Sequence, residues 1–180
     1  MNRFALFIAL CFAVIAFQPS SVYAQKVKIA VVDVEKMLSD SKAGKNIQKQ
    51  LTARRESFQQ EFTTRENDLM NAEKSLVEQK KSMSAEDFSA KRQEFEKQLF
   101  ETRALFQKRR NSLDKGLGNA LGELRKNIIQ VTAEIADEQN FQVVLSRDSV
   151  VIVEKEMDIT DQVLARLDQN IQSINLDVSK

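Results

Sequence analysis

Apolar residues recur at steps of seven and four between Ala43 and Lys81, in a stretch that is otherwise strongly polar. This spacing places apolar side chains on one narrow face of a helix, as in a coiled coil. Arg55, Arg65 and Gln79 interrupt the same face, so we expect a loosely packed seam. The apolar members of the face are Leu51, Phe58, Phe62, Leu69, Leu76 and Met83.

A second helix is expected to begin within the stretch QKKSMSAEDFSAKR, residues 79–92. Ser84 and Asp87 have the spacing of a capping box, in which the two side chains satisfy free N–H groups at a helix start. Acidic residues in the new helix's first turn and lysines before the turn also match the helix dipoles. We therefore predict a turn near residues 82–84. The alternative is one continuous helix.

The return helix is expected from Ala85 to about Gln139 and carries its own apolar face. At 1.5 Å per residue the first arm alone would extend roughly 55–60 Å, which is long for a small domain. The chain is therefore predicted to be mainly α, with an elongated antiparallel hairpin. The face of the return helix comprises Phe88, Phe95, Leu99, Phe106, Leu113, Leu117, Leu121, Leu124, Ile128, Val131 and Ile135.

Three short β-branched runs, Lys28–Val34, Phe141–Ser146 and Ser149–Glu154, predict a small β-rich body at the hairpin's base. Arg147-Asp148 is the expected hairpin turn between the last two strands. Three short strands leave edges and one face uncovered, so we expect several copies to share one core. The expected oligomerisation core consists of Ile29, Val31, Val143, Val144, Leu145, Val151 and Ile152.

The first 24 residues have the pattern of a secretory signal peptide. Arg3 precedes an unbroken apolar run, Phe4–Phe17, which is short for a membrane span, and Val22 and Ala24 take the −3 and −1 positions. The alternative is a membrane anchor. A lipoprotein modified at Cys11 is disfavoured, because the residue before it is a large leucine.

Together these patterns predict four parts of the chain. Thr160 is expected to cap a short amphipathic helix near the end of the body. The parts are a signal peptide over 1–24, a β-rich oligomerisation body from 25–42 and 113–168, a helical hairpin over 43–112, and a loose tail over 169–180.

The composition of the exported chain limits the kinds of catalytic and binding site that it can form. Removing the signal peptide leaves 26 basic and 26 acidic side chains (27 − 1 and 26 − 0), and no cysteine. The sequence has no histidine or tryptophan, so histidine-based catalysis is excluded and a metal site would need carboxylates alone. No nucleotide-binding or EF-hand spacing is present. We expect no cofactor, no metal and no enzymatic activity, and the zero net charge disfavours nucleic-acid binding.

Candidate binding residues lie on the arms. Phe100, Met70 and Val77 each follow a residue of the apolar face and should point away from the seam. Several weak apolar contacts on mobile arms could hold an unfolded chain through multivalency. The candidate client-binding residues are Phe100, Met70, Val77, Phe88 and Met83. The candidate lipid or lipopolysaccharide contacts at the tip are Lys80, Lys81, Lys91 and Arg92.

Three of the chain's four glycines, at 116, 118 and 122, fall within the return helix. Their spacing differs from a dinucleotide-binding motif, and no strand precedes them. Glycine inside a helix costs stability. We therefore expect a bend or a close approach of another helix near the root of the arm.

The segments KIAVVDVEKML, SKAGK, FQVVLSRDSVVIV and DITDQVLARLDQ, together with the charged hairpin, resemble the Skp/OmpH family of periplasmic chaperones. The resemblance covers nearly all of the mature chain. It implies a homotrimer with a β-barrel body and three helical tentacles around a cavity. It also implies an ATP-independent, periplasmic holdase for unfolded outer-membrane proteins. Well-known members are strongly basic, whereas this mature chain is neutral.

Two other functions remain open at this stage. One is a periplasmic adaptor or scaffold whose hairpin docks a specific partner, although such hairpins usually sit in glycine-rich β-domains. The other is an enzyme that uses Asp33, Glu35 or Asp158. These acids are the expected caps of strands and helices, or solvated side chains.

Overall fold

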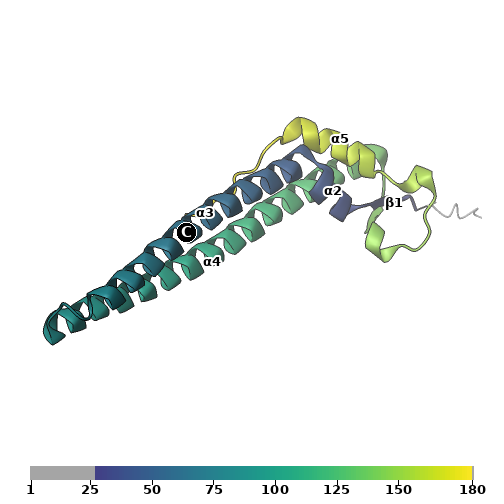
Figure 1. Cartoon of the computed structure of the whole chain (residues 1–180). Coiled ribbons are helices and arrows are strands. Elements are labelled where there is room, and N and C mark those ends of the chain that lie inside the picture. The colour runs from purple at the N-terminus through teal and green to yellow at the C-terminus, as the bar shows by residue number, and fades with distance from the viewer. Residues whose placement is uncertain (1–26, 180) are drawn as a thin grey trace, which may run out of the picture.

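A computed structural model describes residues 27–179, which form a long helical hairpin standing on a small body (Figure 1). The predicted signal peptide lies outside these residues. The elements are β1 (Ile29–Val32), α2 (Val34–Asp40), α3 (Lys42–Gln79), α4 (Ala85–Gln139), β2 (Val143–Ser146), the 3₁₀ turns η1 (Arg147–Ser149) and η2 (Lys155–Met157), and α5 (Thr160–Asn170). The predicted class, mainly α with a small β part, is confirmed. Within residues 27–179, no helix combines the length and apolarity needed to cross a membrane.

Helices α3 and α4 form the two arms and lie within two residues of their predicted bounds. Asp87 donates its backbone N–H to Ser84 Oγ at 3.1 Å, and the Ser84 hydroxyl donates to the Asp87 carboxylate at 2.7 Å. Residues 80–84 leave the helical path. The capping pattern and the turn are confirmed, and the continuous-helix alternative is wrong.

The seam between the arms is loosely packed, as expected. Residues 52–112, all described by the structure, include no buried side chain. Phe62 and Phe106 meet edge to face with their ring centroids 4.6 Å apart. Arg109 lies over the Phe58 ring at 5.2 Å and pairs with Glu61 at 2.8 Å. The arms therefore associate through scattered, half-buried contacts, whereas the continuous core lies at their root and in the body.

Helix α2, which the sequence pattern did not predict, separates β1 from α3. The Asp33 carboxylate caps it by accepting from the N–H of Lys36 at 2.8 Å, and Met37 is its buried residue. Ser41 then ends α2 and caps α3, since its hydroxyl accepts from the N–H of Gly44 at 3.1 Å. The predicted strand reached only Val34, and residues 35–40 were assigned to no element, because a seven-residue helix carries too few periods to recognise.

The sheet differs from the three-stranded prediction. β1 and β2 pair in parallel, with Ile29 opposite Val143, and Val31 forms an isolated parallel bridge with Asp158. The predicted hairpin turn is instead the 3₁₀ turn η1, and residues 150–154 form no strand in the described chain. A two-residue hairpin needs positive φ angles, which Asn and Gly adopt far more readily than Arg-Asp. The prediction of a third strand within one chain is therefore wrong.

Helix α5 returns over the body and fastens it to the arms. Arg166 pairs with Glu138 of α4 through two contacts of 2.6 and 2.8 Å. The carboxylate of Asp168 accepts from the N–H of Lys42, at the start of α3, at 2.7 Å. Thr160 is the first residue of α5 rather than its cap, and its hydroxyl accepts from the N–H of Asp33 at 2.9 Å. The predicted capping role of Thr160 is wrong because that hydroxyl ties α5 to the end of β1.

The segment after α5 also differs from expectation. Ile174 and Leu176 are buried in the same core cluster as Ile47, Leu51 and Leu113 at the root of the arms. Residues 171–179 lack helix or strand but are packed, so the expectation of a loose tail is corrected for them. Alternation of apolar and polar residues over only six positions was too short a signal to predict this packing.

Candidate functional site

The arms expose three of the five predicted client-binding residues. The exposed fractions are 60% for Met70, 66% for Val77 and 72% for Phe100, which are high for large apolar side chains. All three lie beside the seam rather than in it, as their sequence positions predicted. The arms therefore expose single apolar side chains, separated by charged residues, rather than one deep pocket.

Met83 and Phe88, the other two candidates, lie at the tip and are half-buried. The Lys80 ammonium lies 5.7 Å from the centre of the Phe88 ring, within the range of a cation–π contact. These two side chains therefore also pack the turn that joins the arms, which makes them less available than Met70, Val77 and Phe100.

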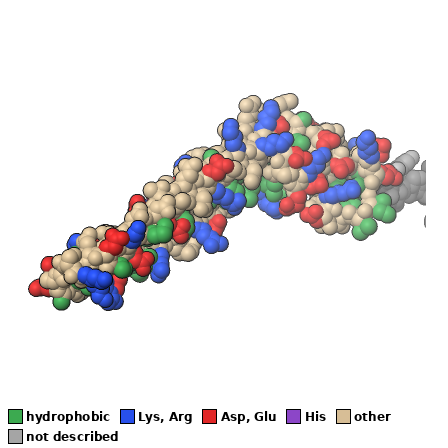
Figure 2. All heavy atoms as spheres, in the orientation of Figure 1, with side chains coloured by type: hydrophobic (Ala, Val, Ile, Leu, Met, Phe, Trp, Pro, Cys, Tyr) green, Lys and Arg blue, Asp and Glu red, His purple; other side chains and the backbone are tan. Residues whose placement is uncertain are grey.

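The basic tip is partly occupied by contacts within the chain. Lys91 donates to the Gln79 side chain at 2.7 Å, and Arg92 pairs with Glu96 at 2.8 Å. Lys80 covers Phe88, and Lys81 is exposed. Lys and Arg side chains gather on one side near the tip in the space-filling view, with acidic side chains close by (Figure 2). The tip thus presents a mixed surface.

The body exposes an apolar surface beyond β2. Val151 is 95% exposed and Ile152 is 88% exposed. The body also has an open, mainly apolar groove, lined by residues of α4, of β2 and of the loop between them, including Ile129, Phe141 and Leu145. Hydrophobic side chains are visible at this end of the molecule in Figure 2. We call the exposed apolar residues of this region, Ile129, Val143, Leu145, Val151 and Ile152, the body surface. Within residues 27–179, β2 pairs with β1 alone, whereas β1 also forms the bridge from Val31 to Asp158.

The predicted oligomerisation residues fall into two groups. Val31 is buried inside the single chain, and Ile29 and Val144 are half-buried. Val143, Leu145, Val151 and Ile152 are exposed. The residues of the second group can contact another chain, whereas Val31 is already buried in the core of its own chain.

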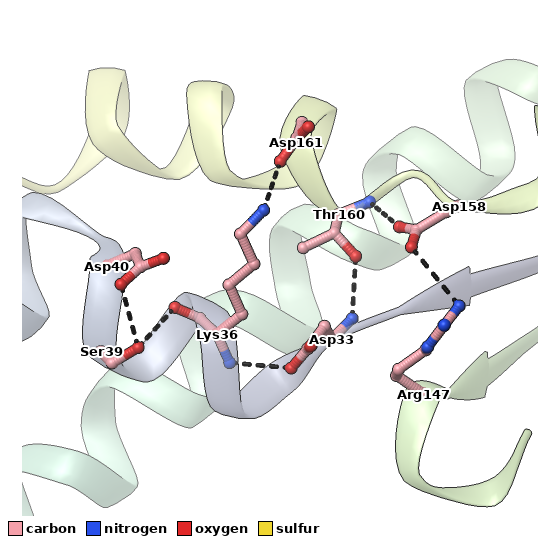
Figure 3. Close-up of polar contacts among 8 residues, drawn as sticks. All are labelled: Asp33, Lys36, Ser39, Asp40, Arg147, Asp158, Thr160 and Asp161. Atoms are coloured by element: carbon pink, nitrogen blue, oxygen red, sulfur yellow. Dashed lines mark hydrogen bonds and ion pairs between the residues drawn. The ribbon is translucent and has the colours of Figure 1, made fainter. Parts of the chain in front are cut away.

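Two of the candidate catalytic acids, Asp33 and Asp158, lie at a polar junction between β1, α2 and α5 (Figure 3). Asp33 caps α2, and Asp161 pairs with Lys36 at 2.9 Å. Asp158 accepts from the N–H of Thr160 at 2.9 Å and lies 4.0 Å from Arg147. The Asp33 carboxylate thus caps a helix, whereas Asp158 and Asp161 each join two elements through Arg147 and Lys36. All three have structural roles.

The surroundings of Asp158 and Lys36 at this junction favour the charged forms of both side chains. Partial burial opposes ionisation of Asp158, but hydrogen bonds from Thr160 and the charges of Arg147 and Lys36 outweigh it and lower its pKa. The hydrogen bond to Asp161 and its charge raise the pKa of Lys36. Glu35, the third candidate acid, is exposed and lies 3.5 Å from Arg125. Among residues 27–179, no three carboxylates are grouped to hold a metal ion.

The docking of α5 is expected to weaken in acid. The hydrogen bond from Arg166 lowers the pKa of Glu138 below its ordinary value of 4.5. A carboxylate with a lowered folded pKa stabilises the fold above its unfolded pKa and loses that contribution as pH falls through the folded value. The gap in Tm between wild type and Glu138→Gln should therefore be present at pH 6 and close below pH 4.5. Glu123→Gln, on the same helix, is the control, and a gap that persists in acid would contradict this assignment.

Two residues with a role in the structure, Ile129 and Gln50, were not singled out by the sequence pattern. Ile129 is exposed and directly follows the buried Ile128, so the signal that identified Phe100 after Leu99 would also have found it. Gln50 binds the backbone of the C-terminal segment. No local pattern marks that role, since its partners lie more than 120 residues away.

Residues 28–167 match the family model described as "Outer membrane protein (OmpH-like)". Among solved structures, the chain is similar to a candidate outer membrane chaperone (OmpH-like) from Caulobacter crescentus CB15. The TM-score is 0.79 at 20% sequence identity, and the match covers 85% of this chain and 90% of that chain. At this identity the likeness shows a shared fold. No protein with a curated description matches the sequence.

Proposed function

The chain belongs to the OmpH-like outer membrane protein family, and from that membership we propose that it is a periplasmic holdase chaperone. It binds unfolded outer-membrane proteins between its helical arms, without ATP, and prevents their aggregation before they reach the membrane. The predicted signal peptide, with cleavage after Ala24, supports delivery of the chain to the periplasm.

The observation that carries this proposal is the composition of the arm surface. Between Leu51 and Leu113 the arms, which the structure describes throughout, bury no side chain, yet they expose Met70, Val77 and Phe100. A hairpin built only to be rigid would bury its large apolar residues in the seam. These arms instead leave single large apolar side chains exposed to water.

Such a surface suits an unfolded β-barrel protein as its client. The client's strands carry alternating apolar residues and unpaired backbone groups, which aggregate readily in water. Many weak contacts along two arms can retain such a chain through multivalency and still release it. The client is protected because it is kept apart from other unfolded chains, and this does not require tight binding at one site.

Self-association completes the proposal. We infer a homotrimer in which the body surface, including Val151 and Ile152, is covered by neighbouring copies. Two adjacent β-branched residues with this exposure are an unfavourable surface for a lone chain. Joining three bodies would place three pairs of arms around a common space, which a single hairpin cannot enclose.

Contact between the tip and anionic lipid or lipopolysaccharide headgroups is a further part of the proposal. Lys80, Lys81, Lys91 and Arg92 supply the positive charge. Because Arg92 is paired with Glu96 and the mature chain has zero net charge, this attraction should be weak and sensitive to salt.

The test is aggregation of a urea-unfolded outer-membrane β-barrel protein on dilution, followed by light scattering. The mature chain, residues 25–180, is expected to suppress scattering at near-stoichiometric amounts of assembled protein. An unrelated folded protein at equal mass is the control. If scattering is unchanged at tenfold molar excess of a chain that circular dichroism shows to be folded, the holdase proposal fails and the adaptor alternative gains support.

A further inference from the structure

The C-terminal segment, residues 171–179, lies beyond the part of the chain that matches the family model, which ends at residue 167. It leaves α5 at the body and runs back along α3 toward the middle of the hairpin, as the yellow coil in Figure 1 shows. It has neither helix nor strand, yet it belongs to the buried core. An irregular segment that nevertheless has buried side chains is held in place by a specific surface of the protein.

Side chains of the segment alternate between that surface and solvent. Ile174 and Leu176 are buried, whereas Asn175 and Asp177 are exposed. Alternation with a period of two is typical of an extended chain with one face against a surface. The surface thus accepts two apolar side chains spaced two residues apart.

The side chain of Gln50 binds the backbone between these two residues. Its Nε2 donates to the carbonyl oxygen of Ile174 at 2.8 Å, and its Oε1 accepts from the N–H of Leu176 at 3.0 Å. Asn46, one turn earlier on α3, accepts from the same Nε2 at 2.6 Å and so holds the Gln50 amide in place. One amide group therefore satisfies both a main-chain acceptor and a main-chain donor of the extended segment.

Gly116 of α4 provides the space for the segment. A Cβ atom at this position would collide with the backbone carbonyl of Asp177, and Val178 Cγ1 would lie only 3.4 Å away. Gly118 and Gly122 have open space where a Cβ would be. Among these three glycines a close approach occurs at Gly116 alone, and the approaching group is the irregular C-terminal segment rather than the helix that the glycine cluster predicted.

These contacts join the body to both arms. Helix α5 is fixed to the body by Arg166–Glu138 and to the start of α3 by Asp168. The segment continues from α5 to Gln50 on α3 and Gly116 on α4. Between Leu51 and Leu113, just beyond these points, the arms bury no side chain up to the tip, over residues that the structure fully describes. The segment thus acts at the boundary between the rigid root and the loosely packed arms.

We propose that the root of the hairpin carries a binding site for an extended peptide, formed by Gln50 and Gly116, and that residues 171–179 occupy it as a strap. The strap holds α3 and α4 together at the root and restrains movement of the arms relative to the body. The ligand class is a main chain in extended conformation with apolar side chains at alternate positions.

Hydrogen–deuterium exchange of the full mature chain tests the strap through a pair of matched glycine variants. Alanine in place of glycine ordinarily stabilises a helix, so Gly118→Ala should slow exchange in α4 or leave it unchanged. Gly116→Ala should instead displace the strap and accelerate exchange at least about tenfold around residues 42–56 and 110–124. Gln50→Ala should act in the same direction, and Gln48→Ala, an exposed glutamine nearby, should have no effect.

A peptide experiment tests the binding site itself. A chain that ends at Asn170 should show the same acceleration at the root, and the synthetic peptide IQSINLDVSK should reverse it in trans. The same peptide with aspartate replacing Ile174 and Leu176 should not. Unchanged exchange at the root in both the shortened chain and Gly116→Ala would overturn the proposal. Acceleration spread equally over the body and the tip would also overturn it, because a strap acts locally.

Discussion

Replacing Val151 and Ile152 together by aspartate is expected to convert the assembled protein into single chains that keep the helical hairpin. Both side chains are almost fully exposed in the single chain, so charge there should cost its fold little. Burial of Val or Ile contributes about 1.5–3 kcal/mol, and burial of an unpaired carboxylate is unfavourable. Association should therefore weaken by at least roughly a hundredfold at each interface.

Mass measurement in solution and far-ultraviolet circular dichroism together test this result. The wild type should have the mass of three chains, and the double variant the mass of one chain with an unchanged helical spectrum. Val77→Asp, which places a carboxylate on an exposed arm residue, should leave the mass unchanged. An assembled double variant would show that the body surface is not the interface.

The structure also decides which substitutions are informative. By sequence pattern alone, Val31→Asp is an equally good test of assembly. Val31 is buried in its own chain, where it forms the bridge to Asp158. A carboxylate there should unfold the body whether or not the chains associate. Loss of assembly in that variant would therefore say nothing about the interface.

Replacing Met70, Val77 and Phe100 by serine is expected to reduce aggregation suppression at least about tenfold while the fold is retained. Partial burial of each side chain against a client contributes about 1 kcal/mol, less than full burial would. Losing two or three such contacts corresponds to at least a tenfold change in binding. Because all three residues are exposed in the free chain, its Tm should change little.

The amount of chaperone needed for half-maximal suppression of light scattering measures this effect. A control variant in which Glu66, Lys74 and Gln93 become serine alters equally exposed arm positions without changing the net charge. It should match the wild type. If the apolar variant also suppresses aggregation as the wild type does, the client contacts lie elsewhere on the protein.

Most of the hairpin could be predicted from the sequence because its signals are local. The heptad spacing, Ser84 with Asp87, and the charges around the turn lie within a few residues of the features they specify. Exposure of Phe100 followed equally from its position next to Leu99. The prediction of α2 failed because seven residues carry too little periodicity, and the strand at 149–154 was wrong because β-branched composition does not supply a pairing partner.

The sequence by itself determined that this chain is a long, loosely seamed hairpin on a small body, since spacing and capping act between near neighbours. Only the tertiary structure decided that β1 and β2 pair in parallel, and that Val31 is internal while Val151 and Ile152 are exposed. It alone decided that residues 171–179 dock against Gln50 and Gly116. These outcomes depend on groups more than 60 residues apart, which come together only when the arms fold back and α5 crosses the body.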